Sequence, residues 1–480
     1  MTSLLDELKD YSGKNIYPCH MPGHKRRAFE HIPQDIAEID LTEVEGTDDL
    51  HDPSGIILEA ERFAALQLGA DESFFLINGS SSGILAAISA CTDKGGKILM
   101  ARNSHKSAYN AVYLRELDPV YIFPEMMEGL PVMEAVTAGE VRKALDENPD
   151  IRAVFIVSPT YEGRLADIGS IAGTVHERGI PLIVDEAHGA HLSFDEGNMS
   201  DAIRCGADIT VQSVHKTLPA PTQTAILSVK GTLVDREKLR RFLSIYQSSS
   251  PSYPMMAMID GCIRYMSDNR GLVPAFKDNF EKLLKRLEVC DKLIFRPFIG
   301  ELRSQKADHG KLLICTDASG VSGAQLAGML RDKYGIETEM ACPGYVLAMF
   351  TVCDDGSGYD RVAEALIDLD RSLTDTGGCH GAADQTEGSC NASGFRSLPV
   401  PVRRMSISEA MDSEREYISL EEACGRISAE QIFIYPPGTP ILTAGEMIER
   451  EYIDYILKCI SEGFNVKGIG DGCISVVKNG

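Results

Sequence analysis

The stretch ADITVQSVHKT, residues 207–217, places a lysine directly after a short apolar run. Residues 209–212 predict a buried strand, and Lys216 follows the carboxyl end of that strand. By strand alternation, Ser213 and His215 point to the same side. A lysine in a low-dielectric cleft becomes a nucleophilic amine suited to a Schiff base, whereas an ordinary surface lysine is the alternative for this residue taken alone.

Outward from this stretch, residues 56–230 alternate between helical and strand-like patterns. Helices are predicted at 57–68, 83–91, 139–147 and 167–178, and strands at 97–100, 120–123, 153–157, 181–184, 209–212 and 224–229. Short apolar strands alternating with helices indicate an α/β domain with a mainly parallel sheet covered on both faces. Chemistry in such a sheet gathers at the carboxyl ends of the strands.

The segment PLIVDEAHGAH, residues 181–191, puts Asp185 at such a strand end. A partly desolvated carboxylate is costly unless a cation pairs with it, and a protonated pyridine nitrogen would be such a cation. The DEAH string also occurs in helicases, but the GxxxxGK[ST] loop that a helicase needs is missing from the sequence. His188 and His191 lack a third ligand in helical register, so no metal site is predicted.

Two further segments follow predicted strands or open predicted helices. In NGSSSG, residues 78–83, glycines, hydroxyls and free N–H groups suit a phosphate, although a serine-rich helix cap explains the pattern equally well. In RNSHKS, residues 102–107, His105 could stack on a ring or shuttle protons, with a solvated loop histidine as the alternative.

The order of these groups is more specific than any one of them. A phosphate loop, a histidine and a strand-end aspartate precede a lysine 31 positions beyond that aspartate (216 − 185). The large domain of fold-type-I enzymes that use pyridoxal 5'-phosphate (PLP) presents its cofactor groups in the same order, and the chain resembles them.

The amino-acid composition limits the kinds of binding partner that are expected. The 480 residues carry 47 basic and 71 acidic side chains, 47 − 71 = −24, a field that disfavours nucleic acid and anionic membranes and attracts cationic solutes. Thirteen cysteines without CxxC spacing are typical of a reducing compartment. The sequence shows neither a signal-peptide pattern nor an apolar run of about 20 residues, so a cytoplasmic location is predicted.

The remaining chain is expected to add smaller units. Strands at 312–316 and 347–352 and a helix at 362–373 indicate a small α+β domain. Residues 374–397, rich in Gly, Ser, Ala and Thr, predict a flexible linker. The expected organisation is an N-terminal segment that contributes to the active site, a PLP-binding large domain, the small domain, the linker and a C-terminal α+β domain, at 1–55, 56–290, 291–373, 374–397 and 398–480.

At these residues the chain resembles the ornithine/lysine/arginine decarboxylase family, in its short bacterial form without an N-terminal wing domain. HMPGHK, DEAHGAH and SVHK carry the specific part of the resemblance. The supporting motifs are DDLHDP (48–53), NGSSSG, RNSHKS, SPTYEG (158–163), SSSPSYPMMA (248–257), YPPGTP (435–440) and the Gly-Glu pair at 445–446. Serines in the phosphate loop where relatives often have threonine, Pro221 and the long linker depart from the family pattern without touching the chemistry.

The resemblance implies PLP as cofactor and a role for each matching residue. Lys216 would carry the internal aldimine, Asp185 would pair with the pyridinium nitrogen, and His105 would stack on the ring. The phosphate would be held by Ser80, Ser81, Ser82, Ser213 and His215. Ser249 would come from a second subunit, so a homodimer or an assembly of dimers is expected.

The implied reaction is α-decarboxylation of a basic amino acid, with arginine preferred over lysine or ornithine. Lys216 or His188 would return the proton to Cα, and the residues do not decide between them. Glu446, or alternatively Asp48 or Asp49, would hold the distal cation of the substrate.

Two alternatives remain open. Another PLP reaction on the same scaffold, transamination or carbon–sulfur cleavage, could use Arg296, Arg303 or Arg331 to hold the α-carboxylate. A regulatory homologue without activity is disfavoured, because Lys216, Asp185 and His105 are all intact.

Overall fold

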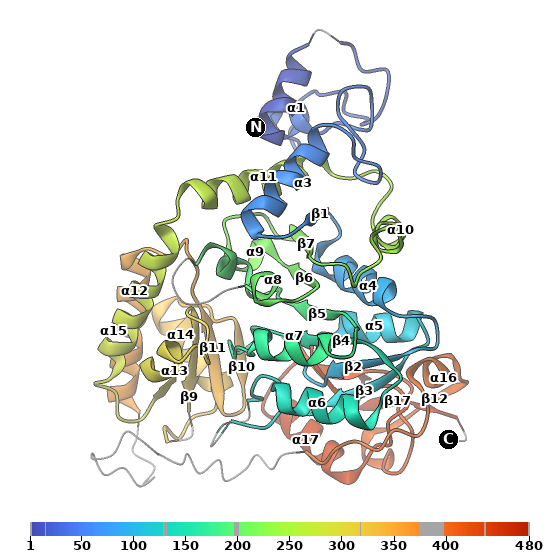
Figure 1. Cartoon of the computed structure of the whole chain (residues 1–480). Coiled ribbons are helices and arrows are strands. Elements are labelled where there is room, and N and C mark those ends of the chain that lie inside the picture. Colours follow the sequence, from blue (N-terminus) through green and yellow to red (C-terminus); the bar gives the residue numbers. More distant parts are fainter. Residues whose placement is uncertain are drawn as a thin grey trace.

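The computed structural model describes residues 2–14, 16–127, 130, 132–195, 201–316, 318–373, 398–435 and 438–478, so the predicted linker at 374–397 lies outside the described residues. A large α/β domain occupies the centre, with a smaller sheet domain to one side and the C-terminal part below it (Figure 1). The N-terminal helix α1 lies at the far end from the C-terminal part.

The large domain is built on a seven-stranded sheet in the order β1-β7-β6-β5-β4-β2-β3. Its strands are β1 (Glu72–Leu76), β2 (Lys97–Ala101), β3 (Asp118–Ile122), β4 (Ile151–Val157), β5 (Leu182–Asp185), β6 (Ile209–Gln212) and β7 (Ala225–Val229). β7 runs antiparallel to both neighbours, and the pairs from β6 to β3 are parallel. This confirms the predicted mainly parallel sheet. β1 was not predicted.

Helices cover both faces of this sheet, as the alternation along its strands requires. Ile98 and Met100 of β2 pack in one apolar cluster, whereas Leu99 and Ala101 pack in another on the opposite face. The helices of this domain are α3 (Ile56–Leu68), α4 (Gly79–Cys91), α5 (Lys106–Leu114), α6 (Ala138–Glu147), α7 (Ile168–His176), α8 (Ala202–Cys205), α9 (Val214–Thr217) and α10 (Arg236–Tyr246). Because both faces of the sheet are covered, a site in this domain is expected at the edge where the carboxyl ends of β5 and β6 lie.

Long helices lead from the large domain into the small one. α11 (Tyr253–Asp268) packs against α1 (Leu4–Gly13) and α3, and α12 (Leu272–Leu287) packs against α15 (Gly356–Ser372). The small domain carries an antiparallel sheet in the order β10-β11-β9-β8. Its elements are β8 (Ile294–Arg296), α13 (Ile299–Arg303), β9 (Lys311–Cys315), α14 (Gly323–Tyr334), β10 (Met340–Cys342) and β11 (Tyr345–Met349).

The C-terminal part contains two three-stranded sheets, β12-β17-β16 and β14-β13-β15. Its elements are α16 (Ile407–Asp412), β12 (Arg415–Ser419), β13 (Ile432–Ile434), β14 (Pro440–Leu442), α17 (Arg450–Ser461), β15 (Val466–Lys467), β16 (Ile469–Gly470) and β17 (Cys473–Val477). No helix among the described residues has the length and apolarity needed to cross a bilayer.

Candidate active site

Lys216 lies in the single helical turn α9, directly after β6, as its position in the sequence predicts. Its side chain is half-buried, and its Nζ is 3.1 Å from Nε2 of His188, within hydrogen-bonding distance. Burial lowers the pKa of this amine, and the negative charges of Asp185 and Glu339 oppose the shift. A lysine with a lowered pKa holds more of the neutral amine that reacts with a carbonyl.

Asp185 ends β5 and is buried, 3% exposed. Its Oδ1 accepts a hydrogen bond of 3.1 Å from the N–H of Ala187, and within the described chain the carboxylate makes no ion pair. Burial raises the pKa of this carboxyl, and the charge of Lys216 opposes the shift. A buried carboxylate in this state suits a cationic nitrogen that arrives from outside the chain, such as a protonated pyridine.

His105 caps the N-terminus of α5 through its ring nitrogen, which accepts from the N–H of Ser107 at 3.3 Å. Burial and the charges of Lys216 and Lys106 lower its pKa to about 4, so the ring is neutral near pH 7. A β-carbon on Gly438 would lie 3.6 Å from Cδ2 of this ring, so Gly438 of the C-terminal part borders it.

The predicted phosphate loop forms the first turn of α4. Asn78 caps that helix without a side-chain hydrogen bond, so it leaves the N–H groups of the first turn to another acceptor. The Ser213 hydroxyl donates to the Ser80 hydroxyl at 2.8 Å, which brings the loop together with the segment before Lys216. The Ser82 hydroxyl instead donates to the Gly79 carbonyl at 2.8 Å. Its predicted contact with a phosphate would require that bond to break.

Three other residues predicted for the cofactor or the phosphate loop lie around this turn. Ser81 is exposed, and the half-buried His215 bonds through Nδ1 to the Thr224 carbonyl at 2.9 Å. Ser249 is exposed in the segment before α11. Its neighbour Ser248 donates its N–H to Oδ1 of Asn78 at 3.3 Å, so this segment lies beside the phosphate loop of its own chain.

The residues predicted to hold a substrate cation have other partners. Glu446 is 1% exposed and pairs with Arg102 at 2.9 Å, and its pKa is raised by burial against the charge of Arg102. Its carboxylate also accepts from the N–H of Thr443 at 2.7 Å. The carboxylate of Glu446 is thus buried and already paired, and its role toward a substrate stays a prediction.

Asp48 is also engaged with its own chain. Its carboxylate accepts from the N–H groups of Ser54, Gly55 and Ile57 at 2.8, 2.8 and 2.9 Å, so it caps the start of α3. Burial acts to raise its pKa, but these donors hold it below the usual range. Asp49 accepts from the N–H of His51 at 2.8 Å. The geometry of both carboxylates fits a structural turn better than a substrate contact.

Residues that the sequence reasoning missed complete the surroundings of Lys216. Glu339 is exposed, precedes β10 and accepts a hydrogen bond from the Tyr161 hydroxyl. Tyr161 lies edge-on to His188 with ring centroids 4.8 Å apart. Lys311 of β9 is buried and reaches Nδ1 of His188 at 2.8 Å. Tyr161 belongs to the SPTYEG motif, but Lys311 and Glu339 stood in no motif.

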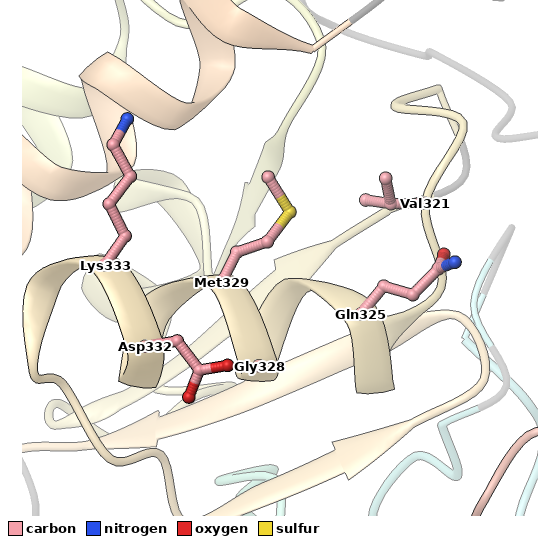
Figure 2. A pocket seen from close by; sticks show the side chains of 6 residues that line it. All are labelled: Val321, Gln325, Gly328, Met329, Asp332 and Lys333. Carbon is pink, nitrogen blue, oxygen red and sulfur yellow. The ribbon is translucent and has the colours of Figure 1, made fainter.

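Two of the three arginines considered for transamination pair with carboxylates of their own chain. Arg296 pairs with Glu301 at 2.8 Å, and Arg331 is on α14, where it pairs with Asp332 at 3.2 Å. A hollow on the outside of α14 contains no predicted site residue (Figure 2). It is lined by Val321, Gln325, Gly328, Met329, Asp332 and Lys333. His191 bonds to Asp308 at 2.8 Å, and the described residues form no cluster of three metal-ligand side chains.

The fold and the site together define the class of protein. An amine of lowered pKa, a buried carboxylate and an uncapped helix N-terminus fit the aldehyde, the ring nitrogen and the phosphate of PLP. The structure superposes on solved lysine decarboxylases of Francisella novicida and Pseudomonas aeruginosa, both with a TM-score of 0.81 and 19% identity. The matches cover 99% and 100% of this chain, and 81% and 80% of those chains. At this identity they show the fold alone, which is the fold-type-I fold of PLP enzymes.

Sequence comparison then gives the family. The model of the Orn/Lys/Arg decarboxylase major domain matches residues 2–302, and the model of the C-terminal domain matches residues 391–466. The arginine decarboxylase of Bacillus subtilis is 32% identical over 99% of this chain and 97% of its own length. The constitutive lysine decarboxylase of Escherichia coli is 26% identical over 87% of this chain and 70% of its own. The chain belongs to the Orn/Lys/Arg decarboxylase family and is an amino-acid decarboxylase.

Proposed function

We propose that this chain removes the α-carboxylate of arginine as CO₂, with PLP held on Lys216. The observation that carries the proposal is the convergence of Lys216, Asp185 and His105 at the carboxyl ends of parallel strands β6, β5 and β2, where the charges of Lys216 and Asp185 act on each other and Lys216 acts on His105. When bound, PLP acts as the electron sink for the carbanion left by decarboxylation.

The residues of the chain have separate tasks in this proposal. Lys216 supplies the neutral amine that binds the cofactor, and Asp185 keeps the pyridine nitrogen protonated through a preorganised charge. Neutral His105 would lie against the ring. Ser80, Ser81, Ser213 and His215, with the first turn of α4, would hold the phosphate. Either Lys216 or His188, which are hydrogen bonded to each other, would return the proton to Cα.

Arginine as the substrate is supported by the relatives, because several similar chains of full length are named arginine decarboxylase. Glu339 supports a cationic substrate in general. Its carboxylate is exposed, and its charge acts on both Lys216 and Lys311. We therefore assign the distal cation to Glu339, which accepts from the neutral Tyr161 hydroxyl, rather than to Glu446, which is paired with the charge of Arg102, or Asp48, which accepts from several backbone N–H groups.

A homodimer is part of the same proposal. The N-terminal segment exposes several apolar side chains within one short stretch, and monomeric soluble proteins seldom expose such a group. They are Ile16, Tyr17, Met21 and Phe29, exposed by 47, 81, 59 and 49%. A second copy of the chain would cover them, and Ser249 would then be shared between subunits.

The scattered cysteine spacing supports a cytoplasmic location.

The test is to record the visible absorption of the purified protein with PLP and then to measure CO₂ from arginine, lysine and ornithine separately. We expect a band that Lys216→Ala abolishes, and CO₂ from arginine faster than from the other two. A band without CO₂ from any of the three would refute the reaction and keep the cofactor. Sedimentation of the same samples should give a dimer or a multiple of it; a monomer with full activity would refute a shared site.

A further inference from the structure

Lys311 is a buried amine that the proposed reaction does not yet use. It begins β9, is 1% exposed and makes no ion pair within the described chain. Its Nζ lies 2.8 Å from Nδ1 of His188, 3.2 Å from Sδ of Met349 and 5.7 Å from the centroid of the Tyr161 ring. Burying a lysine whose amino group is not paired with a carboxylate costs free energy, so its burial here indicates a role other than an ion pair.

His188 joins this amine to Lys216. Its Nε2 is 3.1 Å from Nζ of Lys216, and its Nδ1 is 2.8 Å from Nζ of Lys311, so both ring nitrogens face an amine. A neutral imidazole donates one hydrogen bond and accepts one, whereas an ammonium only donates. Both contacts are hydrogen bonds only if the three groups share at most one excess proton, because two ammonium groups would leave the ring N–H without an acceptor.

We propose that Lys311 is a positioning residue that takes the proton Lys216 must lose, and returns it, through His188. In the forward direction Lys216 gives a proton to Nε2 of His188 while the Nδ1 proton of the ring passes to Nζ of Lys311. The net change is that the ammonium of Lys216 becomes an amine and the amine of Lys311 becomes an ammonium. This inference rests on the proposed use of Lys216 to bind PLP.

The surroundings of the three groups are compatible with one shared charge. The pKa of Lys311 is lowered to about 8, chiefly by burial and also by the charge of Lys216, against the opposing charges of Asp308, Glu339 and Glu162. Around Lys216 burial is opposed by Asp185 and Glu339.

His188 completes the set. Burial first, then Lys311, Lys216, His105 and His215, hold its pKa well below the usual range, so the ring is a relay and not a resting place for the proton. Both lysines thus have lowered pKa values and share Glu339 as a nearby anion, so the proton can pass between them.

The packing holds Lys311 in place. Gly163 has a φ of +87°, and a β-carbon there would lie 2.7 Å from Cβ and Cγ of Lys311, so only glycine permits this approach. The Gly163 carbonyl accepts the N–H of Asp308 at 2.8 Å, which ties the loop of the large domain to the segment before β9. These contacts hold the backbone and the base of the Lys311 side chain against the loop that carries Gly163.

The test follows PLP capture by the apoprotein, mixed rapidly and monitored by visible absorption from about pH 6 to 9. Lys311→Met removes the proton acceptor, so the midpoint of the pH profile should rise by about one unit and capture at pH 7 should slow about tenfold. His188→Gln should give the same shift, and the double variant should add nothing to it. Lys311→Arg keeps a positive charge but cannot accept a proton, so its capture rate at pH 7 should fall as in Lys311→Met, whereas a purely electrostatic role of Lys311 would leave that rate near the wild-type value.

Lys333→Met, which removes an exposed lysine of α14 paired with Asp368, is the matched control and should leave the profile unchanged. A Lys311→Met midpoint equal to that of the wild type, or shifts of Lys311→Met and His188→Gln that add, would overturn the relay. ¹⁵N spectra of the histidine rings in the apoprotein give a second readout: the His188 ring should be neutral near pH 7 and change tautomer balance in Lys311→Met. If wild-type protein captures no PLP, the proposed function fails, while these spectra still decide the relay.

Discussion

At the scale of single residues, Glu337 and Glu339 show why proximity in sequence does not equal proximity to the chemistry. Both are exposed and lie in the segment before β10, but only Glu339 acts on the pKa of Lys216 and accepts from Tyr161. A charged hydrogen bond to a substrate contributes about 1.5–3 kcal/mol. If Glu339 holds the distal cation as proposed, position 339 is where the chain distinguishes a cationic substrate from a neutral one.

We expect Glu339→Gln to raise the KM for arginine about tenfold or more, because the distal cation loses its anionic partner. Glu337→Gln is the matched control and should leave KM unchanged. Steady-state CO₂ release over a range of arginine concentrations measures both. An unchanged KM in Glu339→Gln would return the distal cation to another carboxylate.

Asp185 and Lys216 can be predicted from the sequence because Asp185 ends, and Lys216 follows, a run of apolar residues that is typical of a buried strand. Lys311 could not be found in this way, since a lysine at the start of a strand is usually solvated. Glu446 was assigned to the substrate because the Gly-Glu pair resembles a family motif. Its ion-pair partner Arg102 lies 344 positions away in the sequence, and no local sequence pattern predicts an ion pair between residues so far apart. The roles of the cofactor residues stay predictions until they are tested.

At the scale of elements, α3 and β1 are joined by a buried acid. Oε1 of Glu61 on α3 accepts the N–H of Phe75 on β1 at 2.9 Å, and burial raises the pKa of this carboxyl to about 8 against that donor. The sequence predicted α3 within one residue of its bounds but missed β1, whose five residues ESFFL follow the helix closely. A strand so short is confirmed by its pairing with β7, which only the tertiary fold supplies.

Because the pKa of Glu61 is higher in the folded chain than its ordinary 4.5, its contribution to stability is complete below pH 4.5 and is lost as the pH rises through 8. Glu61→Gln should remove this loss, a slope of at most about 1.4 kcal/mol per pH unit. The free energy of unfolding of the variant minus that of the wild type should therefore be larger, meaning a relatively more stable variant, at about pH 8 than at about pH 5.

Denaturant unfolding followed by circular dichroism measures this, since the chain has no tryptophan. Glu59→Gln, on the exposed side of the same helix, should keep the wild-type pH dependence. Equal slopes for the wild type and Glu61→Gln would show that Glu61 is ionised in the folded chain.

At the scale of the whole molecule, Arg102 fastens the C-terminal part to the large domain. Its guanidinium pairs with Glu446, donates to the Ile441 carbonyl at 3.2 Å and lies among the rings of Tyr109, Tyr121 and Phe123. The predicted order of domains along the chain is compatible with this arrangement, and the exact boundaries stay a prediction. How the parts contact each other did not follow from sequence, because the contacts join residues hundreds of positions apart.

Glu446→Gln leaves the buried Arg102 without its counter-charge, which should lower the free energy of unfolding by about 3–5 kcal/mol. The KM for arginine of the protein that remains folded should not change. Glu451→Gln, exposed in the first turn of α17, is the control and should have little effect on either quantity. A raised KM with unchanged stability would instead support a substrate role for Glu446.

The close approach of Gly163 to Lys311 gives a marker that can be checked in any related sequence. A relative with a side chain at this position must have moved its β9 outward or carry glycine at 311, since a β-carbon at 163 would lie 2.7 Å from both Cβ and Cγ of Lys311. The amino acid at position 163 therefore reports whether a relative has room for a second amine behind the histidine. If the relay operates, loss of that glycine and loss of that lysine should be inherited together.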